Sequence, residues 1–154
     1  MTNEEKLNKQ NQMGLGGMIN NLFGNSSLPF SIFKGRKLVE IIAGENEVFF
    51  EIDKGNDLQE NIHLQLHHVQ DCCEYVDLIK TNGSFSDLID SEILEAEEDY
   101  IDKPSWHTDE TNSSESVTWS YYMLKTEKGK IEWWFKGESN GYYSETLVLE
   151  RIEK

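Results

Sequence analysis

The chain has 154 residues, with 14 Lys and Arg against 29 Asp and Glu, so its formal net charge is -15. This length fits one domain whose core needs neither a disulfide nor a metal. The negative charge disfavours long-range attraction of DNA, RNA and anionic lipid, so a phosphate ligand must meet a local group of cations. The sequence has no apolar run of about 18 residues and no signal-peptide pattern at its start, so we expect a cytoplasmic protein without membrane contact.

Residues 1–28 are polar and rich in glycine, which predicts a flexible N-terminal arm. The exception within it is Met-Ile-Asn-Asn-Leu-Phe at 18–23, which we expect to form one apolar helical turn that docks on the body of the protein or on a second copy. We therefore expect a homo-oligomer, formed through this turn or through sheet edges. Residues 29–154 are predicted to form a single β-rich domain.

Alternating apolar residues and clusters of β-branched and aromatic residues predict an antiparallel hairpin, a third strand and a C-terminal β-meander. The predicted strands cover 38–42, 48–52, 62–67, 117–124, 130–135 and 142–152. Residues 84–89 are predicted to form one helical turn capped by Ser84 or Ser86. The predicted fold class is α+β and mostly β, with about six antiparallel strands and one or two short helices.

Acidic residues are concentrated between 90 and 115, where ten Asp and Glu stand against a single base, Lys103. Pro104 and the polar run at 108–114 predict a long solvated connection after about Tyr100.

The densest group of reactive side chains is His-His-Val-Gln-Asp-Cys-Cys-Glu at 67–74. It follows the alternation of the strand at 62–67, and alternation resumes at Tyr75. The group is therefore predicted to be a bend at the end of a sheet, where the strands on either side give rigid support.

We expect a ligand site built from this bend, from the Asn-Gly turn near residue 140 and from the start of the first strand. The candidate ligand-binding residues are His68, Gln70, Asp71, Cys72, Cys73, Glu74, Trp134, Ser139, Asn140, Tyr142, Tyr143, Glu145 and Arg36. Carboxylate and amide groups suit ribose hydroxyls and purine edges, aromatic rings offer stacking faces, and Arg36 would contact phosphate. The site requires the bend and residues 139–145 to come together in space and to wall one cavity, within one subunit or across two. The competing interpretation places about half of the aromatic rings in the core and Arg36 on an exposed strand start.

No metal and no cofactor are expected. The available metal ligands are His63, His67, His68, Cys72 and Cys73. They lack the two separated ligand pairs that structural zinc sites use. Adjacent cysteines cannot close an ordinary disulfide loop, so we expect both to be reduced, with one buried and one in the wall of the site. The alternative is a disulfide between the two neighbours.

A thiol nucleophile would pair one of the cysteines with His67 or His68. The neighbouring carboxylates Asp71 and Glu74 oppose this, because negative charge disfavours a thiolate. We therefore expect no catalytic residues, and a Cys- or metal-dependent hydrolase is the weaker alternative.

Two blocks of sequence resemble a family of small, functionally uncharacterised proteins of bacteriophages and bacteria. The first has the pattern HHxQDCCExV at 67–76, with Asp-Leu-Ile at 87–89 and Ala-Glu-Glu at 96–98. The second is Trp-Ser-Tyr-Tyr-Met-Leu at 119–124, followed by SNGYYSE at 139–145. The resemblance covers about residues 30–150. It implies a phage or mobile-element origin, where small non-enzymatic proteins often block host defence and some sequester nucleotide-derived immune signals.

The expected function is therefore binding, without conversion, of a small polar ligand such as a cyclic nucleotide or an ADP-ribose derivative, in the host cytoplasm and with no direct contact to nucleic acid. The alternative is an acidic DNA mimic, in which residues 92–102 imitate a phosphate backbone and block a basic groove of a host defence enzyme.

Overall fold

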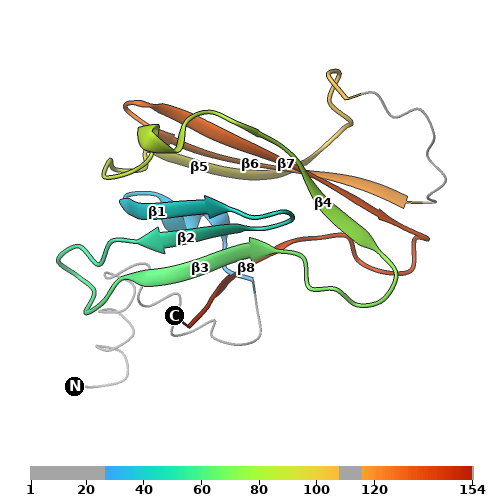
Figure 1. Ribbon diagram of the computed structural model, residues 1–154, viewed down its shortest axis with the longest axis horizontal. Helices are drawn as coiled ribbons and strands as arrows, with labels where there is room; N and C mark the ends of the chain where they lie inside the picture. Colours follow the sequence, from blue (N-terminus) through green and yellow to red (C-terminus); the bar gives the residue numbers. More distant parts are fainter. Residues whose placement is uncertain (1–26, 108–115, 154) are drawn as a thin grey trace, which may run out of the picture.

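The computed structural model describes residues 27–107 and 116–153. Two four-stranded antiparallel sheets stack face to face as a sandwich (Figure 1). The strands are β1 (Leu38–Ala43), β2 (Val48–Ile52), β3 (Ile62–His67), β4 (Tyr75–Asn82), β5 (Glu95–Ile101), β6 (Ser116–Thr126), β7 (Gly129–Ser139) and β8 (Val148–Arg151), and the single 3-10 turns are η1 (Phe30–Phe33) and η2 (Phe85–Asp87). The predicted mostly-β class is confirmed. The described residues contain eight strands where about six were expected, and their only helical elements are the two 3-10 turns.

The first sheet has the order β1-β2-β3-β8. Its first three strands are the predicted hairpin and third strand, and Ile41 lies opposite Phe50 while Phe50 lies opposite Leu64. Ile62, Leu64 and Leu66 are buried and alternate with half-buried His63, Gln65 and His67, because successive side chains of a strand point to opposite faces.

The second sheet has the order β4-β7-β6-β5, and its centre is the long hairpin of β6 and β7. The predicted third strand of the meander, 142–152, is wrong in extent and partner. The strand begins only at Val148, and β8 pairs with β3 of the other sheet. Gly141, whose φ is +89°, lies in the irregular segment after β7, where the chain leaves the second sheet and crosses to the first.

A strand not predicted from the sequence, β5, occupies the acidic segment. Its side chains are mostly exposed, and as an edge strand it pairs only with β6. Charges on an edge strand stay solvated, so backbone pairing with β6 overrides the low strand propensity of Asp and Glu. The solvated connection expected after about Tyr100 therefore begins one residue later, since β5 ends at Ile101.

The predicted helical turn at 84–89 is the shorter η2, and neither serine caps it through its side chain. The Ser84 and Ser86 hydroxyls instead bond each other at 2.8 Å. The expected apolar turn at 18–23 lies outside the described residues, as does the rest of the predicted arm before Ser27. Within the described part of the chain, no helix is long and apolar enough to cross a membrane.

Aromatic rings fill the space between the sheets. Phe50 lies 4.7 Å from Phe33 and 5.7 Å from Trp133, measured between ring centroids, and Phe30 lies 5.1 Å from Tyr122. Phe30, Phe33 and Trp133 have no exposed surface. This rigid core holds the ends of both sheets in a fixed relation.

Two segments cross between the sheets at the same end of the sandwich. The bend, residues 68–74, leads from β3 to β4, and the corner loop, residues 139–146, leads from β7 towards β8. His67 at the end of β3 lies opposite Val148, and Tyr75 at the start of β4 lies opposite Glu138. Both pairs place the end of one crossing segment beside the end of the other.

Candidate functional site

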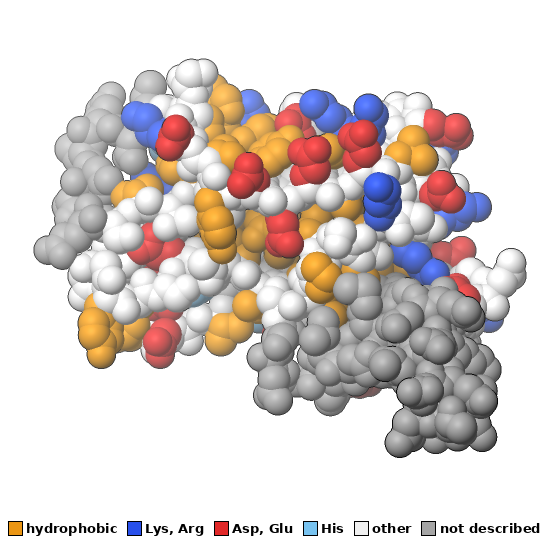
Figure 2. Space-filling view, turned by 180° about the vertical axis from the view of Figure 1, so that it is seen from behind, with side chains coloured by type: hydrophobic (Ala, Val, Ile, Leu, Met, Phe, Trp, Pro, Cys, Tyr) orange, Lys and Arg blue, Asp and Glu red, His pale blue; other side chains and the backbone are white. Residues whose placement is uncertain are grey.

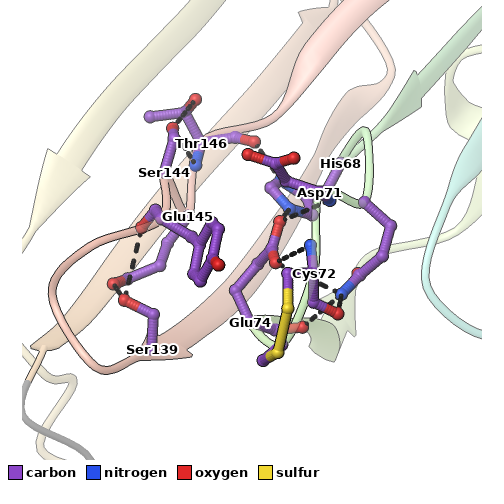
Figure 3. Close-up of polar contacts among 11 residues, drawn as sticks. His68, Asp71, Cys72, Glu74, Ser139, Ser144, Glu145 and Thr146 are labelled. Carbon is purple, nitrogen blue, oxygen red and sulfur yellow. Dashed lines mark hydrogen bonds and ion pairs between the residues drawn. A yellow bond between two sulfur atoms is a disulfide. The ribbon is translucent and has the colours of Figure 1, made fainter.

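His68 joins the bend to the corner loop (Figure 3). Its Nε2 atom lies 2.7 Å from Glu74 Oε2, and its Nδ1 atom lies 2.6 Å from the carbonyl oxygen of Thr146. The imidazole ring of His68 thus bridges a carboxylate of the bend and a backbone carbonyl of the corner loop. The predicted approach of these two parts of the chain is therefore confirmed. Their predicted joint cavity is not seen in the grooves described below, since none of them is lined by residues 68–74.

Glu74 is the centre around which the bend folds. Its side chain is completely buried and accepts hydrogen bonds from the backbone N–H groups of Asp71 and Cys72, both at 2.8 Å. Burial raises the pKa of Glu74, but the hydrogen bonds from Cys72, His68 and Asp71 outweigh it and lower the pKa to about 2. Gln70 donates to the carbonyl oxygen of Glu74 at 2.6 Å. Gln70 and Glu74 thus use their polar groups to hold the bend.

Cys72 and Cys73 are joined by a disulfide, and both are exposed. The expectation of two reduced cysteines with one buried is therefore wrong. The cause is the direction of the bend: Glu74 takes the buried position, which leaves the two preceding residues at the surface. No free thiol is left to act as a nucleophile.

Glu145 packs against Gly137 of β7, where an added Cβ would lie only 2.6 Å from the Glu145 Cβ atom. The carboxylate is 5% exposed, and its Oε2 atom accepts a hydrogen bond from the Ser139 hydroxyl. Ser139 in turn accepts one from the N–H of Gly141 at 3.0 Å. The other carboxylate oxygen, Oε1, is buried and has no hydrogen-bond partner among the described residues. Such an atom is unusual, because buried polar groups are nearly always paired.

A surface groove of about 440 Å³ borders the corner loop at Thr146. It is lined by Tyr100, Ile101, Val117, Thr118, Trp119 and Thr146. Thr118 lies opposite Gly137 in the sheet, and Thr146 follows Glu145 in the chain. A second hollow of about 550 Å³ shares Tyr100 and Thr146 and extends along Glu98 and Asp99. We call the two together the β5 groove.

A family model described as a domain of unknown function, DUF7448, matches residues 32–149. The chain belongs to this family. The match includes the bend and the corner loop, so both crossing segments are part of the DUF7448 domain. No curated protein and no solved structure matches the chain.

In this DUF7448 domain most of the predicted site residues lie in the bend or the corner loop. Asp71, Cys72 and Cys73 are exposed on the bend. Tyr142 is 82% exposed, its ring is 5.0 Å from that of Tyr143, and its N–H bonds the Asn140 side chain at 2.9 Å. With His68, Gln70, Glu74, Ser139 and Glu145, these form the corner site.

Two predicted residues do not join the corner site. Arg36 forms an ion pair with Asp57 at 2.6 Å. It precedes β1, and the start of β1 lies level with the start of β3. The corner site lies at the opposite end of the sheet, where β3 ends. Trp134 points away from the core because its neighbours Trp133 and Phe135 fill it, and its ring lies 5.4 Å from that of Trp106. The phosphate contact expected from Arg36 is therefore absent from the corner site.

Sequence reasoning missed Thr146, Thr118 and Tyr100. Thr146 acts through its backbone carbonyl, which no side-chain pattern reveals. Tyr100 belongs to β5, and its sequence signal was the weak alternation of Ala96, Glu98 and Tyr100 within an acidic run. Among the described residues, no group of three or more His, Cys, Asp or Glu is arranged to hold a metal ion.

Acid will destabilise this domain partly through Glu74. Its pKa is lower in the folded chain than the ordinary 4.5, so its stabilisation is present above about pH 4.5 and is lost as the pH falls towards 2. We expect urea midpoints between neutral pH and about pH 3 to fall less steeply for Glu74→Gln than for the wild type. The control Glu95→Gln, at an exposed position on β5, should keep the wild-type slope. Equal slopes for all three proteins would contradict this role.

Proposed function

We propose that the corner site and the β5 groove bind a small polar ligand without converting it. The observation that carries this proposal is the buried Oε1 atom of Glu145, which has no hydrogen-bond partner among the described residues. An unpaired buried acceptor is costly, so a ligand N–H or O–H group that reaches it would gain more than an ordinary hydrogen bond.

The groove chemistry favours a ligand with hydroxyl and amino groups. Thr118 and Thr146 supply hydroxyls, and Tyr100 supplies an exposed ring for stacking. No Lys or Arg occurs among the described residues that line the β5 groove. The base and sugar of a nucleotide-derived molecule fit this lining better than its phosphates do, because phosphates need cations or free backbone N–H groups.

Binding without turnover is supported by the state of the reactive groups. A general base needs an acceptor within reach of the substrate, whereas both Glu74 oxygens already accept hydrogen bonds inside the bend. Both ring nitrogens of His68 are also engaged, and the cysteines form a disulfide. The resemblance to small phage proteins supports a role in sequestering a nucleotide-derived signal of host immunity.

The test is calorimetry of the full chain against adenosine, ADP-ribose, cyclic dinucleotides and inorganic phosphate. We expect one nucleoside-bearing compound to bind, and Glu145→Gln and Thr118→Val each to weaken it by about tenfold or more. Asp71→Ala, at an exposed position on the bend, should also weaken it, because the proposed site includes the bend. The control Glu95→Gln should bind as the wild type does. Failure of every nucleoside-bearing compound, or full binding by Glu145→Gln, would overturn the proposal.

A second candidate function follows from β5. Glu95, Glu97 and Asp99 are exposed on this open edge, so the acidic residues could meet a basic groove of a host enzyme. Figure 2 shows acidic side chains interspersed with hydrophobic and basic ones on the face seen from behind. A DNA mimic would need an unbroken row of acidic side chains, so this mixed surface favours the first function. Strongly salt-dependent binding to a basic protein, without any small ligand, would favour this function over the first.

A further inference from the structure

The outer face of the first sheet carries an apolar groove of about 310 Å³, separate from the corner site. Ile42 and Phe49 lie opposite each other on β1 and β2, and Ile152 borders the groove just beyond the end of β8. Glu40, Glu51 and His63 also line it, and Ile42 is 48% exposed. We call this the outer groove. An exposed apolar patch of this kind on an otherwise polar sheet face marks a contact surface.

We propose that residues 18–23 of the same chain occupy the outer groove. The described chain begins beside β8: the Ser27 hydroxyl accepts a hydrogen bond from the N–H of Leu149 at 2.9 Å, and the N–H of Leu28 donates to the Leu149 carbonyl at 2.8 Å. Ile152 lies three residues further along and donates its N–H to the carbonyl of His63 at 2.9 Å. The segment that precedes Ser27 therefore starts next to the strand that borders the groove.

The length of chain before Ser27 is sufficient. Phe23 is four residues away, a distance of up to about 13 Å for an extended chain. Ser27 lies on the free edge of β8, and neighbouring strands are about 4.8 Å apart, so β2 lies about 14 Å and β1 about 19 Å from Ser27. The nine residues back to Met18 can span up to about 30 Å, which is enough. Residues 18–23 can thus cross β3 and reach Ile42 and Phe49 without any change in the sheet.

The chemistry of the segment matches that of the groove. Met18, Ile19, Leu22 and Phe23 are apolar and suit a floor made by Ile42, Phe49 and Ile152. The segment has no charged residue, so it adds no repulsion beside Glu40 and Glu51, and the amides of Asn20 and Asn21 can donate to carboxylates at the rim.

Hydrogen exchange of the full chain, followed by mass spectrometry, tests this docking. We expect the amides of residues 18–23 to exchange about tenfold or more slowly than in an unstructured peptide. This protection should be lost in the double variant L22D/F23D and in Ile42→Asp. The control Ile79→Asp changes an isoleucine of similar exposure on β4 in the other sheet, and it should keep the protection.

Three results would overturn the docking. One is exchange of residues 18–23 at the peptide rate in the wild type, and another is retained protection in L22D/F23D. The third is protection that grows with protein concentration together with a dimer mass in native mass spectrometry, which would assign the groove to a second copy and support the predicted homo-oligomer. If Ile42→Asp does not fold, L22D/F23D still gives the decisive comparison, because it changes no residue of the described domain.

Discussion

Replacing Phe50 by Ala is expected to lower the free energy of unfolding by about 3–5 kcal/mol, the usual range for an aromatic ring removed from a core. Phe50 is 2% exposed and contacts the rings of Phe30, Phe33 and Trp133, with centroid distances of 6.5, 4.7 and 5.7 Å. Phe30 and Phe33 come from η1 and Trp133 from β7, whereas Phe50 itself lies on β2. The cavity would therefore open between both sheets and could not close by movement of one side chain. Urea unfolding followed by tryptophan fluorescence measures the loss.

The matched control is Phe49→Ala. Phe49 precedes Phe50 on β2 but points to the outer face, where it is half-buried and borders the outer groove. We expect a clearly smaller loss of stability, because less apolar surface returns to water. Equal losses for the two variants would indicate that the β2 register is displaced by one residue, which would exchange the two faces of the strand.

Replacing Gly137 by Ala is expected to cost about 1–3 kcal/mol of stability and to weaken ligand binding at the corner site. The added Cβ would lie 2.6 Å from the Cβ atom and 3.0 Å from the carbonyl oxygen of Glu145. Both atoms are fixed to the backbone of the corner loop, so the loop itself must move, and the buried carboxylate moves with it. Thermal unfolding and calorimetry with the ligand measure the two effects.

Gly44→Ala is the control for this substitution. Its added Cβ would approach only the side chain of Glu47, with the nearest atoms at 2.9 Å, and this flexible side chain can turn away. We expect nearly unchanged stability and unchanged ligand binding. Wild-type behaviour of Gly137→Ala would show that the corner loop tolerates displacement, and would remove the link between Gly137 and the site.

The sequence predicts strands well where the two faces of a strand differ. In β3, Ile62, Leu64 and Leu66 alternate with polar residues, and this strand was predicted with its observed bounds. In β6 and β7 aromatic and β-branched residues are dense, so both strands were predicted, but the predictions 117–124 and 130–135 are shorter than the observed Ser116–Thr126 and Gly129–Ser139. The acidic β5 lacks this contrast because it is exposed on an edge. The extent of β8 could not be predicted, since its partner β3 is distant in sequence and residues 142–147 have the composition of a strand without its pairing.

The location of the candidate site was predictable, but its internal organisation was not. The concentration of polar residues at 67–74 and the Asn-Gly turn indicated two corners. The hydrogen bonds that use Gln70 and Glu74 inside the bend, and the missing partner of Glu145 Oε1, depend on three-dimensional packing. Arg36 was misplaced for the same reason, because nothing local predicts its ion pair with the distant Asp57.

The pairing of β3 with β8 also bears on how the protein is made. The hydrogen bond between His67 Nε2 and Glu150 Oε1, at 2.6 Å, joins residues 83 positions apart in the chain. During synthesis, all four strands of the second sheet are therefore made before β8, and until then one edge of β3 has unpaired backbone N–H and C=O groups. An unpaired edge can form a sheet with other unfolded chains. We therefore expect refolding to be slow, and we expect its yield to fall at high protein concentration and to rise with chaperones.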